Sequence, residues 1–174
     1  GPRDRDEANA RAATLCQRVA RGDGGAFAEL VDLYQHRIFG FCARMLGDRS
    51  EAEDLAQDVF LSVYRHASEF RGESSFTTWV YRIARNQTLN RIKYLERRGR
   101  STRRSLEDVG EERLVNDGRG PHDLVEGQQT SALVQAAIAE LPEQQRIVLV
   151  LRDIDGLAYE EITDATILPQ ELSA

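Results

Sequence analysis

The sequence contains only two cysteines, Cys16 and Cys42, which are far apart and belong to no Cys-x-x-Cys pair. The three histidines, His36, His66 and His122, are scattered and do not stand beside a cysteine at ligand spacing. This scarcity argues against a disulfide scaffold and against a zinc or other metal site. We expect two reduced thiols, of which at least Cys42 is buried.

Long apolar runs are also missing. None approaches the roughly 20 residues of a membrane-spanning helix, and no signal peptide opens the chain. Hydrophobic residues still make up 41% of the sequence, which is sufficient for ordinary cores. We therefore expect a cytoplasmic protein without membrane insertion.

The usual marks of an enzyme are absent as well. The sequence has no glycine-rich phosphate loop and no nucleophile–base pair. Glu160 and Glu161 are adjacent, so they point to different faces of a helix and cannot act as a carboxylate pair. We expect no catalytic activity, no cofactor and no small-molecule substrate.

Charge, by contrast, is abundant and unevenly distributed. The formal net charge is −6, yet the stretch from Arg82 to Arg104 holds nine basic residues and one acidic residue, Glu96. That stretch carries +8 and the remainder −14. Such segregation indicates two partners, one for each sign of charge.

Apolar residues recur at steps of three and four along most of the chain, which predicts helices almost throughout. The longest stripe runs from Phe27 to Met45 and ends before Gly47, and Asp48 with Glu51 forms a capping box for the next helix. The helix that Asp48 caps is expected to turn Ala52, Leu55, Ala56, Val59 and Val63 inward. The other helices expected in this half of the chain cover about 8–21 and 77–97.

The stretch 99–127 has a different character, because it is polar, contains Gly118, Gly120 and Pro121, and shows no sustained period. It is typical of a linker. Helical spacing then returns at residues Val134, Ala137, Ile138 and Leu141, before Pro142 in the first turn of another helix and a short helix from Tyr159. The sequence thus predicts an all-α fold with two small helical domains, 8–98 and 128–168, joined by a flexible linker, 99–127.

Four motifs follow one another at characteristic separations. They are Gly22-Asp23 with Ala26-Phe27 and Tyr34-Gln35-His36-Arg37, the segment DLAQDVF (54–60), the segment FRGESSFTTWVYRIARN (70–86), and Leu141-Pro142-Glu143 with LRDIDGLAYEEI (151–162). In this order they resemble domains 2 and 4 of extracytoplasmic-function (ECF) sigma factors of the sigma-70 family. The resemblance implies a helical bundle, a helix-turn-helix and a role in transcription initiation.

In that family the surface matching Asp54, Gln57, Asp58 and Phe60 binds the coiled coil of the β′ clamp of core RNA polymerase. The spacing i, i+3, i+4 places the first three of these residues on one side of a helix. Such an acidic and amide-bearing patch would complement a basic partner. The alternative interpretation is a solvated helix face.

The resemblance also implies that a loop captures a flipped base of the single-stranded −10 promoter element. This loop contains Arg71, Gly72, Glu73, Ser74, Ser75 and Phe76. Unpaired DNA requires cations for its phosphates and planar or apolar surfaces for its bases, and basic and aromatic residues alternate here. The next helix adds the candidate DNA contacts Arg82, Arg85, Asn86, Asn90, Arg91 and Lys93.

Not every residue of this segment is expected to contact DNA. Trp79 and Ile83 are expected in the core, where they would hold the loop in place. For Arg82 and Arg85 the alternative interpretation is ordinary surface charge.

The domain 4 motif is expected to form a helix-turn-helix that reads the −35 element, but its end departs from the family. No basic residue follows Arg152, whereas base-edge reading in the major groove needs basic or amide side chains. Two functions are therefore open. The chain is a sigma factor, commonly held by an anti-sigma factor, or a truncated fragment that binds polymerase or an anti-sigma factor and cannot initiate alone.

Overall fold

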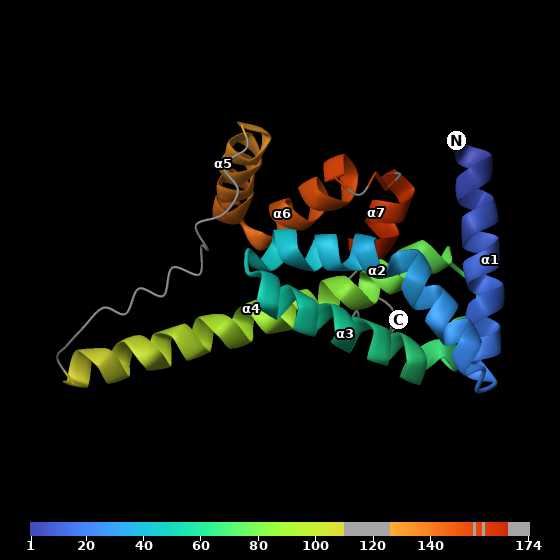
Figure 1. Ribbon diagram of the computed structural model, residues 1–174, viewed down its shortest axis with the longest axis horizontal. Helices are drawn as coiled ribbons and strands as arrows, with labels where there is room; N and C mark the ends of the chain where they lie inside the picture. The colour runs from blue at the N-terminus through green and yellow to red at the C-terminus, as the bar shows by residue number, and fades with distance from the viewer. Residues whose placement is uncertain (110–125, 155, 158, 167–174) are drawn as a thin grey trace.

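The computed structural model describes residues 1–109, 126–154, 156–157 and 159–166, with side chains over 1–99, 132–152, 156–157 and 160–166. All regular structure in these ranges is helical, which confirms the all-α prediction (Figure 1). The elements are α1 (Pro2–Ala20), α2 (Gly24–Leu46), α3 (Arg49–His66), η1 (Ala67–Glu69), α4 (Phe76–Val109), α5 (Glu126–Glu140), α6 (Glu143–Leu149), η2 (Val150–Ile154) and α7 (Tyr159–Thr166).

Local sequence explains where α2 and α3 begin and end. The carboxylate of Asp23 accepts a hydrogen bond from the backbone N–H of Ala26 at 3.1 Å, which caps α2. Gly47 ends α2 with a φ of 70°, a conformation that favours glycine. Asp48 then caps α3 by accepting from the N–H of Glu51 at 3.0 Å. The predicted helix boundary at 47–48 is confirmed.

The apolar stripes face a common core, as expected. The longest, on α2, buries Leu30, Tyr34, Ile38, Phe41, Cys42 and Met45. The stripe on α3 buries Ala52, Leu55, Ala56, Val59, Phe60 and Val63. Both cysteines are free and buried, so the expected reduced, buried thiol at Cys42 is confirmed.

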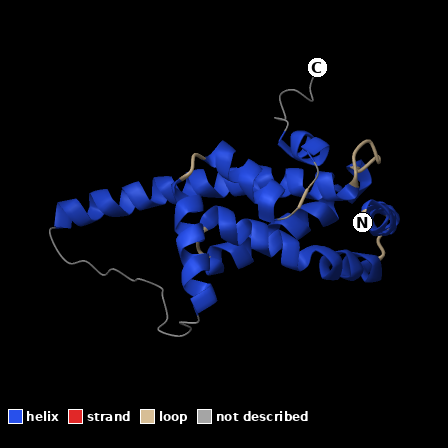
Figure 2. Cartoon of the chain, turned by 90° about the horizontal axis from the view of Figure 1, so that it is seen from above, coloured by secondary structure: helices blue, strands red, loops and turns tan. Residues whose placement is uncertain are grey.

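Helix α4 is longer than predicted. It continues to Val109, twelve residues beyond the expected end near 97, and projects from the bundle (Figures 1 and 2). Gly99 stands between Arg98 and Arg100, and one glycine costs a helix only about 1 kcal/mol relative to alanine. The start of the predicted linker is therefore helical, as is its end, because α5 begins at Glu126. The rest of that linker, 110–125, lies outside the described residues.

The C-terminal helices pack against the N-terminal bundle. Arg146 on α6 donates to the carbonyl of Met45 at 2.8 Å, and Gln135 on α5 donates to the carbonyl of Arg44 at 3.0 Å. Helix α7 packs along α4 on the side away from α3, so α4 lies between them (Figure 1). The buried residues of both halves consequently form one continuous core.

The predicted inward face of α5 is only partly correct. Ile138 is buried, but Val134 is 52% exposed and Ala137 is exposed as well. Among the residues of α5 whose side chains are described, 132–140, Ile138 meets the core. Pro142 precedes α6 as its N-cap, next to the predicted first turn. None of the described helices is both long and apolar enough to cross a membrane.

Candidate nucleic-acid interface

The acidic residues of α3 lie on its surface, where the sequence predicted them. Asp54 and Asp58 have side chains that are 65% and 48% exposed, and both carboxylates point toward α4. Gln57 turns instead toward α2, where it lines a hollow of about 300 Å³ together with Phe60. The predicted patch is thus divided between two sides of α3, and Phe60 is part of the core rather than an exposed contact.

Arg91 on α4 is held by these carboxylates. Its guanidinium donates to Glu51 at 2.6 Å, to Asp54 at 3.0 Å and to Asp58 at 2.9 Å. Burial alone would lower the pKa of Arg91, but the hydrogen bonds to Glu51 and Asp54 outweigh burial and raise it. The structure therefore joins two sets of residues that the sequence assigned to different partners.

The loop before α4 is anchored by aromatic rings. Phe70, Phe76 and Trp79 form a cluster with ring centroids 5.3 to 5.7 Å apart. Phe76 is buried, so this predicted DNA contact belongs to the core, whereas Trp79 and Ile83 pack against the core as expected. Gly72 has a φ of 75°, which the loop needs to reverse direction.

The polar part of the loop stays accessible at the start of α4. Arg71, Gly72 and Glu73 are exposed, and Ser74 and Ser75 are half-buried. The hydroxyl of Ser75 accepts from the N–H of Thr78 at 3.1 Å, so Ser75 caps α4. These five residues belong to one loop, as predicted from the sequence, and their contact with DNA stays a prediction.

A hollow of about 300 Å³ lies beside this loop, between the end of α3 and the start of α4. Its walls combine apolar ring and alkyl surface with amide groups, from Ser62, His66, Glu69, Trp79, Ile83, Asn86 and Gln87. Gln87 donates to the hydroxyl of Ser62, which fixes one amide in the wall. Planar apolar surface with hydrogen-bonding edges is what an extruded base requires. Asn90, predicted alongside Asn86, lines a different hollow next to Arg91.

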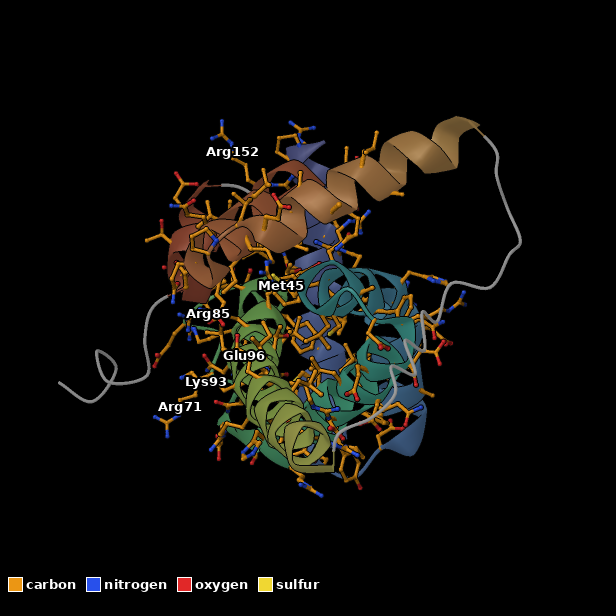
Figure 3. All side chains as sticks on the ribbon, turned by 90° about the vertical axis from the view of Figure 1, so that its left-hand side faces the viewer. Met45, Arg71, Arg85, Lys93, Glu96 and Arg152 are labelled. Carbon is orange, nitrogen blue, oxygen red and sulfur yellow. The ribbon has the colours of Figure 1, made fainter. Side chains whose placement is uncertain are left out.

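The basic residues of α4 divide into covered and exposed groups. Arg82 donates twice to the carbonyl oxygen of Asp164 on α7, at 2.8 and 3.0 Å. Arg85 is 1% exposed, and burial lowers the pKa of its guanidinium. Lys93 is exposed, and Figure 3 shows Lys93, Arg85 and Arg71 on the side of α4 that faces away from α3. Arg82 and Arg85 are therefore not ordinary surface charges.

Sequence reasoning missed the residue that fastens α1 to this site. The side-chain oxygen of Asn9 accepts from the N–H of Thr77 at 3.2 Å and from its hydroxyl at 2.7 Å. Since the Thr77 hydroxyl hydrogen is used there, Tyr34 donates its own hydroxyl to Thr77 at 2.9 Å. Burial raises the pKa of Tyr34, so the phenol stays protonated. A lone asparagine in a polar helix carries no pattern that predicts such a contact.

Among the described residues, no three His, Cys, Asp or Glu side chains are grouped so as to hold a metal ion. The site consists of an acidic helix surface, a polar loop with a walled hollow, and a basic helix side. Such an arrangement binds macromolecules through charge and through base stacking.

Comparisons with known proteins identify the family. The family model described as Sigma-70 region 2 matches residues 30–98, and that described as Sigma-70, region 4 matches residues 131–165. The chain is 40% identical over 151 residues to RNA polymerase sigma-H factor of Pseudomonas aeruginosa, covering 85% of this chain and 78% of that protein. It is 37% identical over 165 residues to ECF RNA polymerase sigma factor SigW of Bacillus subtilis, covering 88% and 83%.

A solved structure has the same fold. The structure of CnrH in complex with the cytosolic domain of CnrY matches with a TM-score of 0.60 and 20% sequence identity, over 89% of this chain and 82% of that one. The acidic α3, the loop with its hollow and the part of α4 up to residue 98 lie within the region 2 match. The chain belongs to the sigma-70 family, as a sigma factor of the ECF type.

Proposed function

We propose that this chain docks on core RNA polymerase through α3 and captures a base of the single-stranded −10 element beside α4. The hollow next to the loop carries the proposal, because it places the apolar walls of Trp79 and Ile83 against the amides of Asn86 and Gln87. The loop that follows Glu69, a residue of the hollow's wall, exposes Arg71, Gly72 and Glu73, which would supply further donors and acceptors. The chain acts by binding, in the cytoplasm, and polymerase performs the chemistry.

Docking through α3 is supported by exposure and charge. Asp54 and Asp58 project from the helix, and Gln57 borders the hollow between α2 and α3. A basic coiled coil such as that of the β′ clamp would meet complementary charge there. Because α3 and α7 lie on opposite sides of α4, a partner on α3 does not collide with the C-terminal helices (Figure 1).

The basic side of α4 is partly closed in the free chain. The guanidinium of Arg82 donates to the carbonyl of Asp164 on α7, and this helix lies where promoter phosphates would approach. We therefore expect stable promoter binding only in the presence of core polymerase. An anti-sigma factor is the expected antagonist, and Leu133, Val134 and Val148 leave apolar surface exposed on α5 and α6 for a protein partner.

The test is a mobility shift of core polymerase plus this protein on a fork-junction probe with a single-stranded −10 element. We expect a core-dependent shift that Asp54→Ala and Asn86→Ala both reduce. Asp54→Ala should lose the complex with core, whereas Asn86→Ala should retain core and lose DNA. Matched controls are Asp6→Ala and Gln17→Ala, which remove an exposed carboxylate and an exposed amide from α1.

The two remaining outcomes separate the hypotheses. If core binds but no promoter-dependent shift or transcript appears, the chain acts as a polymerase-binding protein that cannot initiate alone. If core does not bind, docking through α3 is wrong.

A further inference from the structure

The most extensive ion-pair group among the described side chains connects the two helices of the site. Arg91 on α4 bridges Glu51, Asp54 and Asp58 on α3 through both terminal nitrogens of its guanidinium. Nη1 contacts the first two carboxylates and Nη2 the third. A planar fork of donors suits this geometry, which the single ammonium group of lysine cannot reproduce.

The position of Arg91 separates it from the cations that face DNA. Its side chain is 18% exposed and is turned toward α3. Lys93 follows two residues later and therefore lies on the opposite side of the helix. A phosphate reaching Arg91 would have to displace three carboxylates that already neutralise it.

We propose that Arg91 is a positioning residue for polymerase docking rather than a DNA contact. It orients Asp54 and Asp58 while leaving their exposed parts available to a partner, and it fixes α3 against the helix that carries the base-binding hollow. This inference rests on the proposed function of α3 as the docking surface. The positions 51, 54 and 58 share one side of α3, so without Arg91 three like charges would repel one another.

The two rate constants of docking should respond differently to the loss of Arg91. Association with a basic partner should be unchanged or faster, because α3 then carries more unbalanced negative charge. Dissociation should be faster by roughly tenfold, because the carboxylates are no longer held in the bound geometry. A general loss of folding would reduce the active fraction and leave the dissociation rate of the folded molecules unchanged.

The experiment measures association and dissociation of the full chain with immobilised core polymerase for Arg91→Ala, Arg91→Lys and Asp54→Ala. Arg11→Ala is the matched control, because Arg11 pairs with Glu29 between α1 and α2, away from α3 and α4. Arg91→Lys keeps the charge, so it remains informative if Arg91→Ala fails to fold. Its dissociation rate is expected to lie between the rates of wild type and Arg91→Ala. The salt dependence of promoter binding is then measured at saturating core for Arg91→Ala and Lys93→Ala.

Faster dissociation of Arg91→Ala, with an unchanged salt slope, supports the positioning role. The proposal is overturned if Arg91→Ala dissociates like Arg11→Ala, or if its salt slope falls by about 0.7 per lost contact as expected for Lys93→Ala on single-stranded DNA. Asp54→Ala distinguishes the failure of the positioning role of Arg91 from the failure of docking through α3. If it weakens core binding while Arg91→Ala does not, only the positioning role fails, and if neither does, docking through α3 fails with it.

Discussion

Replacing Arg85 with methionine is expected to stabilise the free chain. Arg85 is 1% exposed, yet its guanidinium makes a single described hydrogen bond, to the side-chain oxygen of Asn86 at 3.0 Å, and its Nε has no partner. An unsatisfied buried donor costs about 1–3 kcal/mol. Methionine has a similar length, fills irregular space and carries no donor, so it removes this cost while retaining most of the packing.

The expected magnitude follows from the difference between two terms. Loss of the bond to Asn86 removes about 1 kcal/mol, and Asn86 borders a hollow where its amide can turn to water. Removal of the unsatisfied buried donor returns about 2 kcal/mol, so the free energy of unfolding should rise by about 1 kcal/mol. For a chain of 174 residues this corresponds to an increase in Tm of about 2–4 °C.

The assay is urea and thermal unfolding of wild type, Arg85→Met and Arg82→Met. Arg82 is the matched control, because it lies one turn earlier on α4 and makes two bonds to the carbonyl of Asp164. Arg82→Met should lower Tm. If Arg85→Met lowers Tm as much as Arg82→Met, the buried guanidinium is well paired and the reasoning is refuted.

Three further predictions concern Asn9, Phe76 and Cys16. Asn9→Ala should weaken −10 binding without affecting core binding, because Asn9 holds Thr77 at the start of α4; retention of full −10 affinity in a fork-probe titration would contradict this. Phe76→Ala should lower the free energy of unfolding by about 3–5 kcal/mol in urea, since Phe76 is buried, whereas an effect on DNA binding alone would restore it as a surface contact. Burial raises the pKa of Cys16 to about 11 from 9.0. Because the folded state holds the thiol proton more tightly than the unfolded state, the free energy of unfolding keeps the full contribution of Cys16 below pH 9 and loses it as pH rises toward 11. Cys16→Ala should reduce this loss when unfolding is measured from about pH 8 to 11.

Much of the fold was predictable because it depends on local chemistry. The stripe from Phe27 to Met45 and the caps at Gly47 and Asp48 determine α2 and the start of α3 without reference to the rest of the chain. The end of α4 was not predictable in the same way. Gly99 weakens the helix there, but by an amount that the neighbouring strong helix formers offset.

The candidate site was predictable in its composition and less so in its geometry. The sequence identified the loop 71–75 and Asn86 as candidate DNA contacts, and the structure leaves 71–73 exposed and places Asn86 in the wall of a hollow. It could not show that Phe76 points inward, because an aromatic ring beside a polar loop serves equally well in the core or against a base. Nor could it show the contact between Arg91 and α3, which lies 33 to 40 residues away in sequence.

Helix α4 has a different neighbour on each of three sides, and this arrangement constrains how the chain works. Arg91 faces α3, Asn86 faces the hollow, and Arg82 faces α7. Because one helix carries all three, a partner bound to α3 fixes the direction in which the hollow presents itself to DNA. Lys93 is already exposed, and freeing the guanidinium of Arg82 requires that α7 leave.

The polar contacts that keep α7 in place are few, and the buried side chains of Ile162 and Ala165 add apolar contact. The guanidinium of Arg82 is held by a single carbonyl, and Arg5 reaches Glu161 and the carbonyl of Gly156 at 3.3 Å from α1, with a side chain that is itself half exposed. Exposed ion pairs contribute about 0–1 kcal/mol, and the Arg5–Glu161 pair joins a half-exposed arginine to a glutamate that is 14% exposed. Opening must also break the apolar contacts of Ile162 and Ala165, which are buried in the common core. We therefore expect α7 to leave only when a bound partner and new contacts of Arg82 with phosphates supply compensating free energy.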